Sequence, residues 1–177
     1  VLSYKYEGNY VPLRGKECST QQMPFISEKI PTFEEFANAS IEDIYGDEII
    51  DAYERKVTGF ESIVLINRGN NKFDVQKLPP LAQSIPILTS DVYDINNDGF
   101  EDIVVAGNIY NTEVETPRLD NQFALVLISN KNSNYNVIGP DKSGLYLSGN
   151  TKSIKIIGKD NPKLLVANNN SDLEVFE

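Results

Sequence analysis

The sequence contains no histidine and no tryptophan, and it has a single cysteine, Cys18. Without histidine, a Ser-His or Cys-His catalytic pair and a histidine-containing zinc site are excluded. One cysteine cannot form a disulfide within the chain, and no histidine is present to activate its thiol, so we interpret Cys18 as structural. These absences remove the commonest hydrolytic and zinc-dependent chemistries.

Basic charge and long apolar runs are also scarce. Lys and Arg number 16 against 26 acidic residues, which gives a net charge of −10. Nucleic-acid binding needs a basic face, so we expect no nucleic-acid partner. No run of about eighteen apolar residues is present, so we expect no membrane span. The chain shows no signal peptide and does not begin with Met, so we interpret the sequence as a piece of a longer, processed polypeptide.

The chain has 177 residues, of which 40% are hydrophobic and 24% are charged, a composition that is ordinary for a globular protein. The chain divides near residue 60. Residues 1–59 form a loop and helical insertion or linker, in which Thr32 with Glu35 and Ser40 with Asp43 predict helix starts. Asp47 predicts a further helix start, whereas residues 14–25 read as loop.

Residues 60–177 are expected to be mainly β, because short β-branched or aromatic runs alternate with Gly, Asn, Pro and Asp. The expected strands are residues 62–67, 73–78, 85–93, 102–106, 123–129, 135–138, 154–157, 164–167 and 173–176. The tyrosines at positions 4, 6 and 10 indicate an additional edge strand that packs on the sheet.

An internal repeat of about 62 residues orders these strands. Residues 61–76 match 123–138 without a gap, and residues 103–108 match 164–169. Four strands in about 60 residues is the unit of a β-propeller blade, so we predict a partial propeller of about two to three four-stranded antiparallel blades. The alternative is that any two β-hairpins resemble each other at this level. Closed propellers need four to eight blades, so the piece requires further blades of its parent chain or self-association.

The segment from Asp94 to Asp102 carries the most specific pattern in the chain. Oxygen-bearing side chains stand at the first, third, fifth and ninth positions, namely Asp94, Asn96, Asp98 and Asp102. Gly99 permits the sharp turn, and the carbonyl of Phe100 adds a backbone ligand. Ca²⁺ prefers six to eight hard oxygens in such an arrangement, whereas Mg²⁺ keeps several waters and demands an octahedron. The pattern therefore predicts a calcium site, with a metal-free Asp/Asn/Gly turn as the alternative.

An EF-hand does not fit this loop. The twelfth position, where an EF-hand places a bidentate Glu, is Val105, and the flanking segments are strand-like rather than helical. We therefore predict a calcium loop that joins two adjacent strands of a sheet. The corresponding loop in the last repeat, residues 158–163, lacks three of the ligand positions, so no metal is expected there.

Residues 91–108, DVYDINNDGFEDIVVAGN, resemble an FG-GAP/VCBS repeat, the calcium-loop blade of integrin-type propellers. Residues 14–26, 31–46, 78–87, 107–120 and 164–176 are similar to the C-terminal part of large secreted VCBS proteins of Bacteroidetes-type bacteria, which often carry an ASPIC/UnbV segment that is not visible here. The resemblance implies that Asp94, Asn96, Asp98, the Phe100 carbonyl and Asp102 are ligands. It also implies an extracellular or cell-surface protein without established catalysis.

Three hypotheses about function follow. The first is a non-catalytic, calcium-binding module of an exported bacterial protein that serves recognition, adhesion or scaffolding, with a protein or a glycan as ligand. The second is a fragment of a propeller enzyme acting on polysaccharide, which a pocket uniting Arg118, Tyr110 and carboxylates would favour. The third is an interaction domain that binds by strand addition to an open sheet edge. The charged loop of Glu113, Glu115, Arg118 and Asp120 is otherwise expected to be solvated, with local ion pairs.

Overall fold

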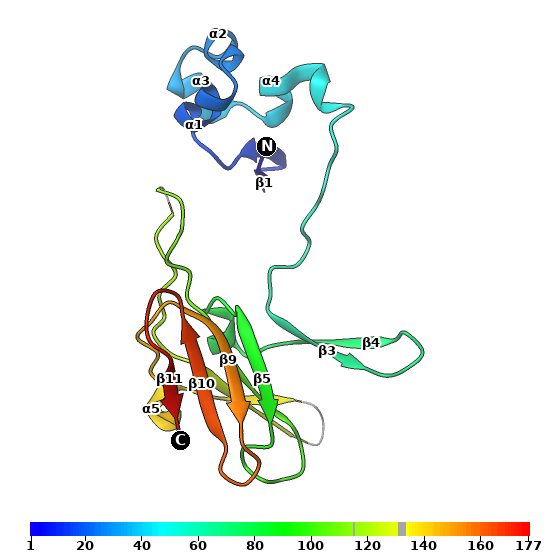
Figure 1. The fold of residues 1–177 in the computed structure, drawn as a ribbon. Helices are drawn as coiled ribbons and strands as arrows, with labels where there is room; N and C mark the ends of the chain where they lie inside the picture. The colour runs from blue at the N-terminus through cyan, green and yellow to red at the C-terminus, as the bar shows by residue number, and fades with distance from the viewer. Residues whose placement is uncertain (115, 131–133) are drawn as a thin grey trace. The chain divides into compact units, whose positions relative to one another are not determined.

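A computed structural model describes residues 1–114, 116–130 and 134–177. The chain forms two compact units, Val1–Thr58 and Gly59–Glu177, so the division lies beside the boundary expected at residues 59 and 60. Figure 1 shows most of the helical elements in the first unit and most of the strands in the second. No helix in the described ranges is long and apolar enough to cross a membrane.

The first unit contains one β-hairpin followed by short helices. The elements are β1 (Ser3–Tyr6), β2 (Asn9–Pro12), α1 (Lys16–Gln22), α2 (Phe25–Lys29), α3 (Phe33–Asn38), α4 (Ile41–Tyr45) and the 3-10 helix η1 (Gly46–Ile49). Its small core consists of Ile26, Ile30, Phe36, Ala39 and Ile44. Each helix is too short to be stable alone, so burial of these side chains holds the helices together.

Both predicted capping boxes are confirmed. The hydroxyl of Thr32 accepts a hydrogen bond from the Glu35 amide at 3.1 Å, and the Glu35 carboxylate accepts from the Thr32 amide at 3.1 Å. The Ser40 hydroxyl and the Asp43 carboxylate form the same reciprocal pair, at 3.1 and 2.9 Å. Each box satisfies two amides that the first helical turn leaves without partners, which explains why α3 and α4 begin where they do.

Three predictions for this unit are wrong. Residues 14–25 contain α1 rather than only loop; its N-cap is Gly15, without a side-chain hydrogen bond, and its only buried residue is Ser19, so neither a cap nor an apolar stripe marks it. Asp47 does not cap a helix but lies inside η1. The residues expected to continue the helix, such as Ile50 and Tyr53, are exposed and pack on no core. The tyrosine strand forms, but β1 pairs with β2 rather than joining a larger sheet.

The described residues of the second unit form three antiparallel sheets, which confirms a mainly β fold. The first sheet is β3 (Ile63–Asn67) with β4 (Phe73–Lys77), and the second is β5 (Thr89–Tyr93), β6 (Asp102–Ala106), β7 (Leu125–Ser129) and β8 (Tyr135–Ile138) in that order. The third is β9 (Thr151–Ile157), β10 (Lys163–Asn168) and β11 (Glu174–Phe176). Two short helices, η2 (Pro80–Gln83) and α5 (Pro140–Ser143), lie in the connections. No closed propeller is formed by the described residues.

Strand boundaries follow the sequence repeat. The hairpin β3–β4 begins its two strands at Ile63 and Phe73, and the hairpin β7–β8 begins its strands at Leu125 and Tyr135, about 62 residues later in both cases. The strand expected at residues 85–93 is shortened most, because residues 85–88 precede β5 and the strand covers only Thr89–Tyr93. Ile85 is buried directly after η2, so its apolar character reflects core packing rather than strand structure.

The sheets pack face to face through two apolar clusters. One cluster places Val64 of β3 against the β5–β8 sheet, where Val105, Leu125 and Leu127 are buried. The other cluster joins the opposite face of β5–β8, with Val104 and Val126, to Ile154, Leu164 and Val166 of the third sheet. Because side chains alternate along each strand, neighbouring residues of β6 and β7 serve different clusters. The β5–β8 sheet is therefore covered on both faces.

Asp91 links the second sheet to the third. Its carboxylate accepts hydrogen bonds from the Ile156 amide at 2.6 Å and from the Lys155 ammonium at 2.8 Å. Burial acts to raise the pKa of Asp91, but these two hydrogen bonds, together with the Val92 amide and the charge of Lys155, outweigh it and hold the pKa below its ordinary value. The Ile154 amide also donates a hydrogen bond to the Thr89 hydroxyl oxygen at 3.1 Å. Strands β5 and β9 are thus fixed side by side, as Figure 1 shows.

We expect Asp91→Asn to lower the free energy of unfolding by about 1.5–3 kcal/mol at neutral pH, because the partly buried hydrogen bond from the Ile156 amide loses its charged acceptor. The lowered pKa means that the unfolded chain takes up the proton first as pH falls. The carboxylate's contribution is therefore complete above about pH 4 and is lost as pH falls further, through the folded-state pKa. Urea denaturation at a series of pH values measures both effects.

Asp74→Asn is the matched control, because its ion pair with Arg68 is 61% exposed on the Asp74 side. Its effect should be below about 1 kcal/mol. Equal losses from the two substitutions would contradict the role assigned to Asp91.

Candidate calcium loop

The candidate site is the connection between β5 and β6. Tyr93 and Asp102 are the last cross-strand pair before the chain leaves the sheet, and residues 94–101 form the loop between them. Asn97 and Gly99 adopt positive φ angles of 57° and 89°, which lets the chain reverse within a few residues. The loop therefore has strands on both sides.

Asp94 organises the first half of the loop. Its Oδ1 accepts a hydrogen bond from the Asp98 amide at 3.0 Å, and its Oδ2 accepts from the Gly99 amide at 2.9 Å. These contacts wrap the main chain around one half-buried carboxylate. A carboxylate has about four lone-pair positions, so Asp94 retains acceptor capacity beyond these two amides.

Asn96 and Asp98 complete the exposed side of the loop. Asn96 Oδ1 accepts from the Asp98 amide at 3.0 Å, and Asn96 Nδ2 donates to Asp98 Oδ2 at 3.0 Å. Asp98 Oδ1 in turn accepts from the Phe100 amide at 2.9 Å. The hydrogen bonds thus connect four of the five predicted ligand residues in one network.

Asp102 anchors the loop to the sheet. It is fully buried at the start of β6. Its Oδ2 accepts from the Ile95 amide at 3.0 Å, and its Oδ1 accepts from the Ser129 amide at 2.8 Å at the end of β7. A buried carboxylate needs such donors, because an unpaired charge in the interior is costly. Burial and then the charge of Asp102 raise the pKa of the nearby Tyr135.

The donor set suits a hard cation. Three carboxylates, one amide oxygen and one main-chain carbonyl lie within nine residues, and oxygen ligands are the kind that Ca²⁺ prefers. In the described part of the chain, no group of three or more His, Cys, Asp or Glu side chains is arranged to hold a metal ion. The predicted site depends on Asn96 and the Phe100 carbonyl as well as on carboxylates, and it stays a prediction.

Sequence reasoning missed the main-chain partners of Asp102. The side chains of Ile95 and Ser129 do not reveal that their amides bond to Asp102, because any non-proline residue supplies an amide. The signal that was available is the apolar environment of Asp102, which directly precedes the run Ile103-Val104-Val105-Ala106. An acid at the start of a buried strand must find donors.

The charged loop after β6 pairs internally. Arg118 and Asp120 form an ion pair at 2.6 Å, and the Arg118 guanidinium lies 4.5 Å from the centre of the Tyr110 ring. The Tyr110 hydroxyl donates to Asp120 at 3.2 Å. Burial and the Asp120 charge raise the pKa of Tyr110, so this phenol stays protonated at neutral pH and is poorly suited to act as a base. Glu115, also predicted in this loop, lies outside the described residues.

Comparisons with family models, with curated proteins and with solved structures find no match for this chain.

We expect Asp102→Asn to destabilise the chain by about 1.5–3 kcal/mol even when metal is absent, because an amide cannot accept from both Ile95 and Ser129 without bringing an N–H group against a donor. Chemical denaturation in EDTA measures this metal-independent cost.

Asp160→Asn, in the exposed loop between β9 and β10, is the control and should change stability by less than about 0.5 kcal/mol. If Asp102→Asn is as mild as this control, Asp102 does not anchor the loop.

Proposed function

We propose that the chain is a calcium-stabilised, non-catalytic β-propeller module of FG-GAP/VCBS type from an exported bacterial protein, serving recognition, adhesion or scaffolding. The observation that carries this proposal is the loop of Asp94–Asp102. It presents several hard oxygens, it joins two neighbouring strands of one sheet, and its last carboxylate is bonded into the sheet.

An ion in this loop stabilises the fold by binding only the folded state. The loop takes its shape between β5 and β6 only when these strands pair, so the unfolded chain would offer the ion no comparable site. The loop is exposed from Ile95 to Glu101, which suits a site of modest affinity. Extracellular calcium sites with dissociation constants of about 10⁻⁴–10⁻³ M are filled outside the cell, which agrees with the proposed surface location.

The arrangement of the sheets supports blade architecture. Three antiparallel sheets pack in sequence order, their strand boundaries repeat, and the first strands of the second and third sheets, β5 and β9, are hydrogen-bonded by side chains. In a propeller the first strands of successive blades lie together around the axis. Further blades of a parent chain, or other copies of this chain, would close the ring, and a protein or a glycan would be the ligand.

The test is thermal unfolding of the chain in EDTA and in millimolar Ca²⁺. When free Ca²⁺ is ten times the dissociation constant, linkage predicts about 1.4 kcal/mol of added stability. For a chain of this size this corresponds to a rise in Tm of roughly 3–6 °C. Asp98→Ala removes a ligand from the exposed side of the loop and should abolish the rise while leaving the EDTA Tm nearly unchanged.

Asp160→Ala, in the equivalent loop of the third sheet, is the matched control and should keep the full rise. Mg²⁺ at the same concentration should produce a smaller rise, because the flexible oxygen set does not impose an octahedron. An unchanged Tm in Ca²⁺ for the native chain would remove the metal from the proposal.

A further inference from the structure

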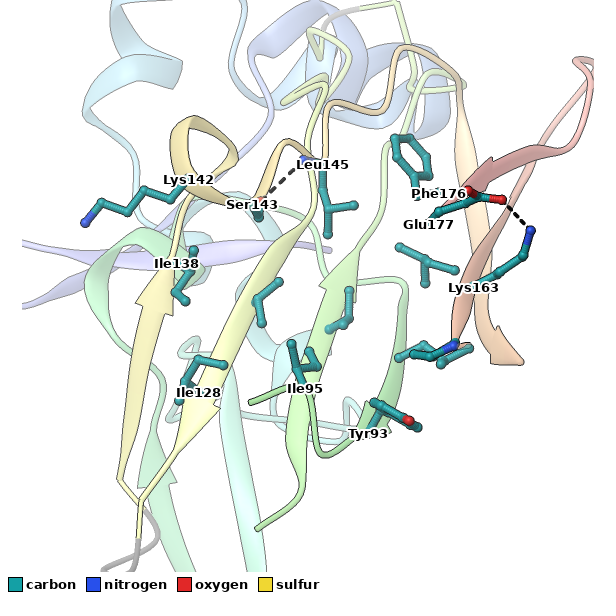
Figure 2. Close-up of a pocket in the computed structure, with 15 residues that line it drawn as sticks. Tyr93, Ile95, Ile128, Ile138, Lys142, Ser143, Leu145, Lys163, Phe176 and Glu177 are labelled. Atoms are coloured by element: carbon teal, nitrogen blue, oxygen red, sulfur yellow. Dashed lines mark hydrogen bonds and ion pairs between the residues drawn. The ribbon is translucent and has the colours of Figure 1, made fainter. Parts of the chain in front are cut away.

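An apolar groove opens between the second and third sheets of the second unit. Its volume is about 310 Å³, and most of its lining side chains are aliphatic or aromatic. Figure 2 shows Ile128 and Ile138 on one wall, Phe176 on the other, and Leu145 beside the α5 helix between them. The charged groups lie at the rim, where Lys142 is exposed and Lys163 pairs with Glu177.

The two sheets that flank the groove have different numbers of strands. Strands β5 and β9 are held together by Asp91 and Thr89, so the sheets are close on that side. On the other side, the β5–β8 sheet continues to β8, whereas the third sheet ends at β11. The face of β8 that carries Ile138 therefore lies opposite no strand of the described chain.

The free edge of β11 selects the kind of molecule that fits. Within the described residues β11 pairs with β10 on one side only, so its other edge offers unpaired main-chain groups beside the groove. An extended polypeptide satisfies these groups and fills the groove with alternate side chains. A small apolar ligand would fill the volume but leave the edge unpaired.

The repeat indicates which side chains that strand should carry. In the β5–β8 sheet the fourth strand is β8, and it directs Tyr135 and Val137 toward the preceding sheet. A fourth strand beside β11 would occupy the equivalent position. It should therefore present an aromatic and an aliphatic side chain, two residues apart, toward the groove.

One strand of this chain has that pattern and is exposed. Phe73 and Val75 of β4 correspond to Tyr135 and Val137 in the repeat, yet they are 53% and 65% exposed. Ile63 and Leu65 extend the same apolar face on β3. The opposite face of this hairpin packs on the β5–β8 sheet through Val64, so β4 cannot reach the groove of its own copy.

From these observations we infer that the groove is a docking site for β4 of a second copy of the chain. This inference rests on the blade architecture of the proposed function. Strand β4 adds to the free edge of β11, antiparallel as β8 is to β7, and Phe73 and Val75 enter the groove between β8 and β11. The two surfaces differ, so the contact is head-to-tail and generates a ring if it closes or a filament if it does not.

The first test measures molar mass in solution as a function of chain concentration. The native chain should form dimers and larger species. The double variant Phe73→Asp, Val75→Lys should be monomeric, and its changes lie on exposed positions that leave folding intact. Phe176→Asp should also be monomeric, because it places a charge in the apolar groove. Val114→Asp, at a fully exposed residue, is the control and should associate as the native chain does.

The second test mixes the two monomeric variants. One retains the groove and the other retains the β4 face, so the mixture should form a one-to-one heterodimer that grows no further. A native chain that is monomeric at every concentration, or a mixture that does not associate, overturns the inference. Association that both variants retain overturns it as well.

Calcium melting separates this inference from the proposed function. If the Tm of the chain rises with Ca²⁺ but the chain remains monomeric, only the docking inference is wrong. If the two variants form the heterodimer but Ca²⁺ leaves the Tm unchanged, the docking inference stands and the proposed calcium module is wrong.

Discussion

The carboxylate of Asp102 is the contact on which the central sheet depends. It is fully buried, and its two oxygens accept main-chain hydrogen bonds from the loop before β6 and from the end of β7. One side chain therefore links the loop before β6, the start of β6 and the end of β7, which lies 27 residues further along the chain. The free-energy cost of burying the charge is offset only when both amides donate to it. The loop conformation and the pairing of β6 with β7 therefore form cooperatively.

A second carboxylate, that of Asp91, joins the central sheet to its neighbour. Asp91 joins β5 to β9, and apolar side chains on alternate positions pack in both directions from the β5–β8 sheet. The central sheet thus has partners on both faces, whereas the outer sheets each have a partner on one. This difference explains why Ile63, Leu65, Phe73 and Val75 on one face of the β3–β4 hairpin are exposed.

Much of this fold could be predicted from local sequence. Strands β3, β6 and β7 combine apolar alternation or continuous burial with Gly, Asn or Asp at their ends, and two capping boxes mark α3 and α4. Helix α1 escaped prediction because it is polar and lacks a side-chain cap. The loop from Asp94 to Asp102 could be located from spacing. Its main-chain donors and the groove could not, since they arise from chain segments that meet only after the sheets have stacked.

The order of the strands has a kinetic consequence. Within each of the three sheets, every strand pairs with its neighbour in the sequence. Pairing between strands that are neighbours in the sequence keeps most loop closures local, although the β6–β7 connection spans residues 107–124, and local closures lower the entropic barrier to folding. Contacts between sheets then resemble the nearest-neighbour terms of a repeat protein, so folding can start in the β5–β8 sheet and spread outward.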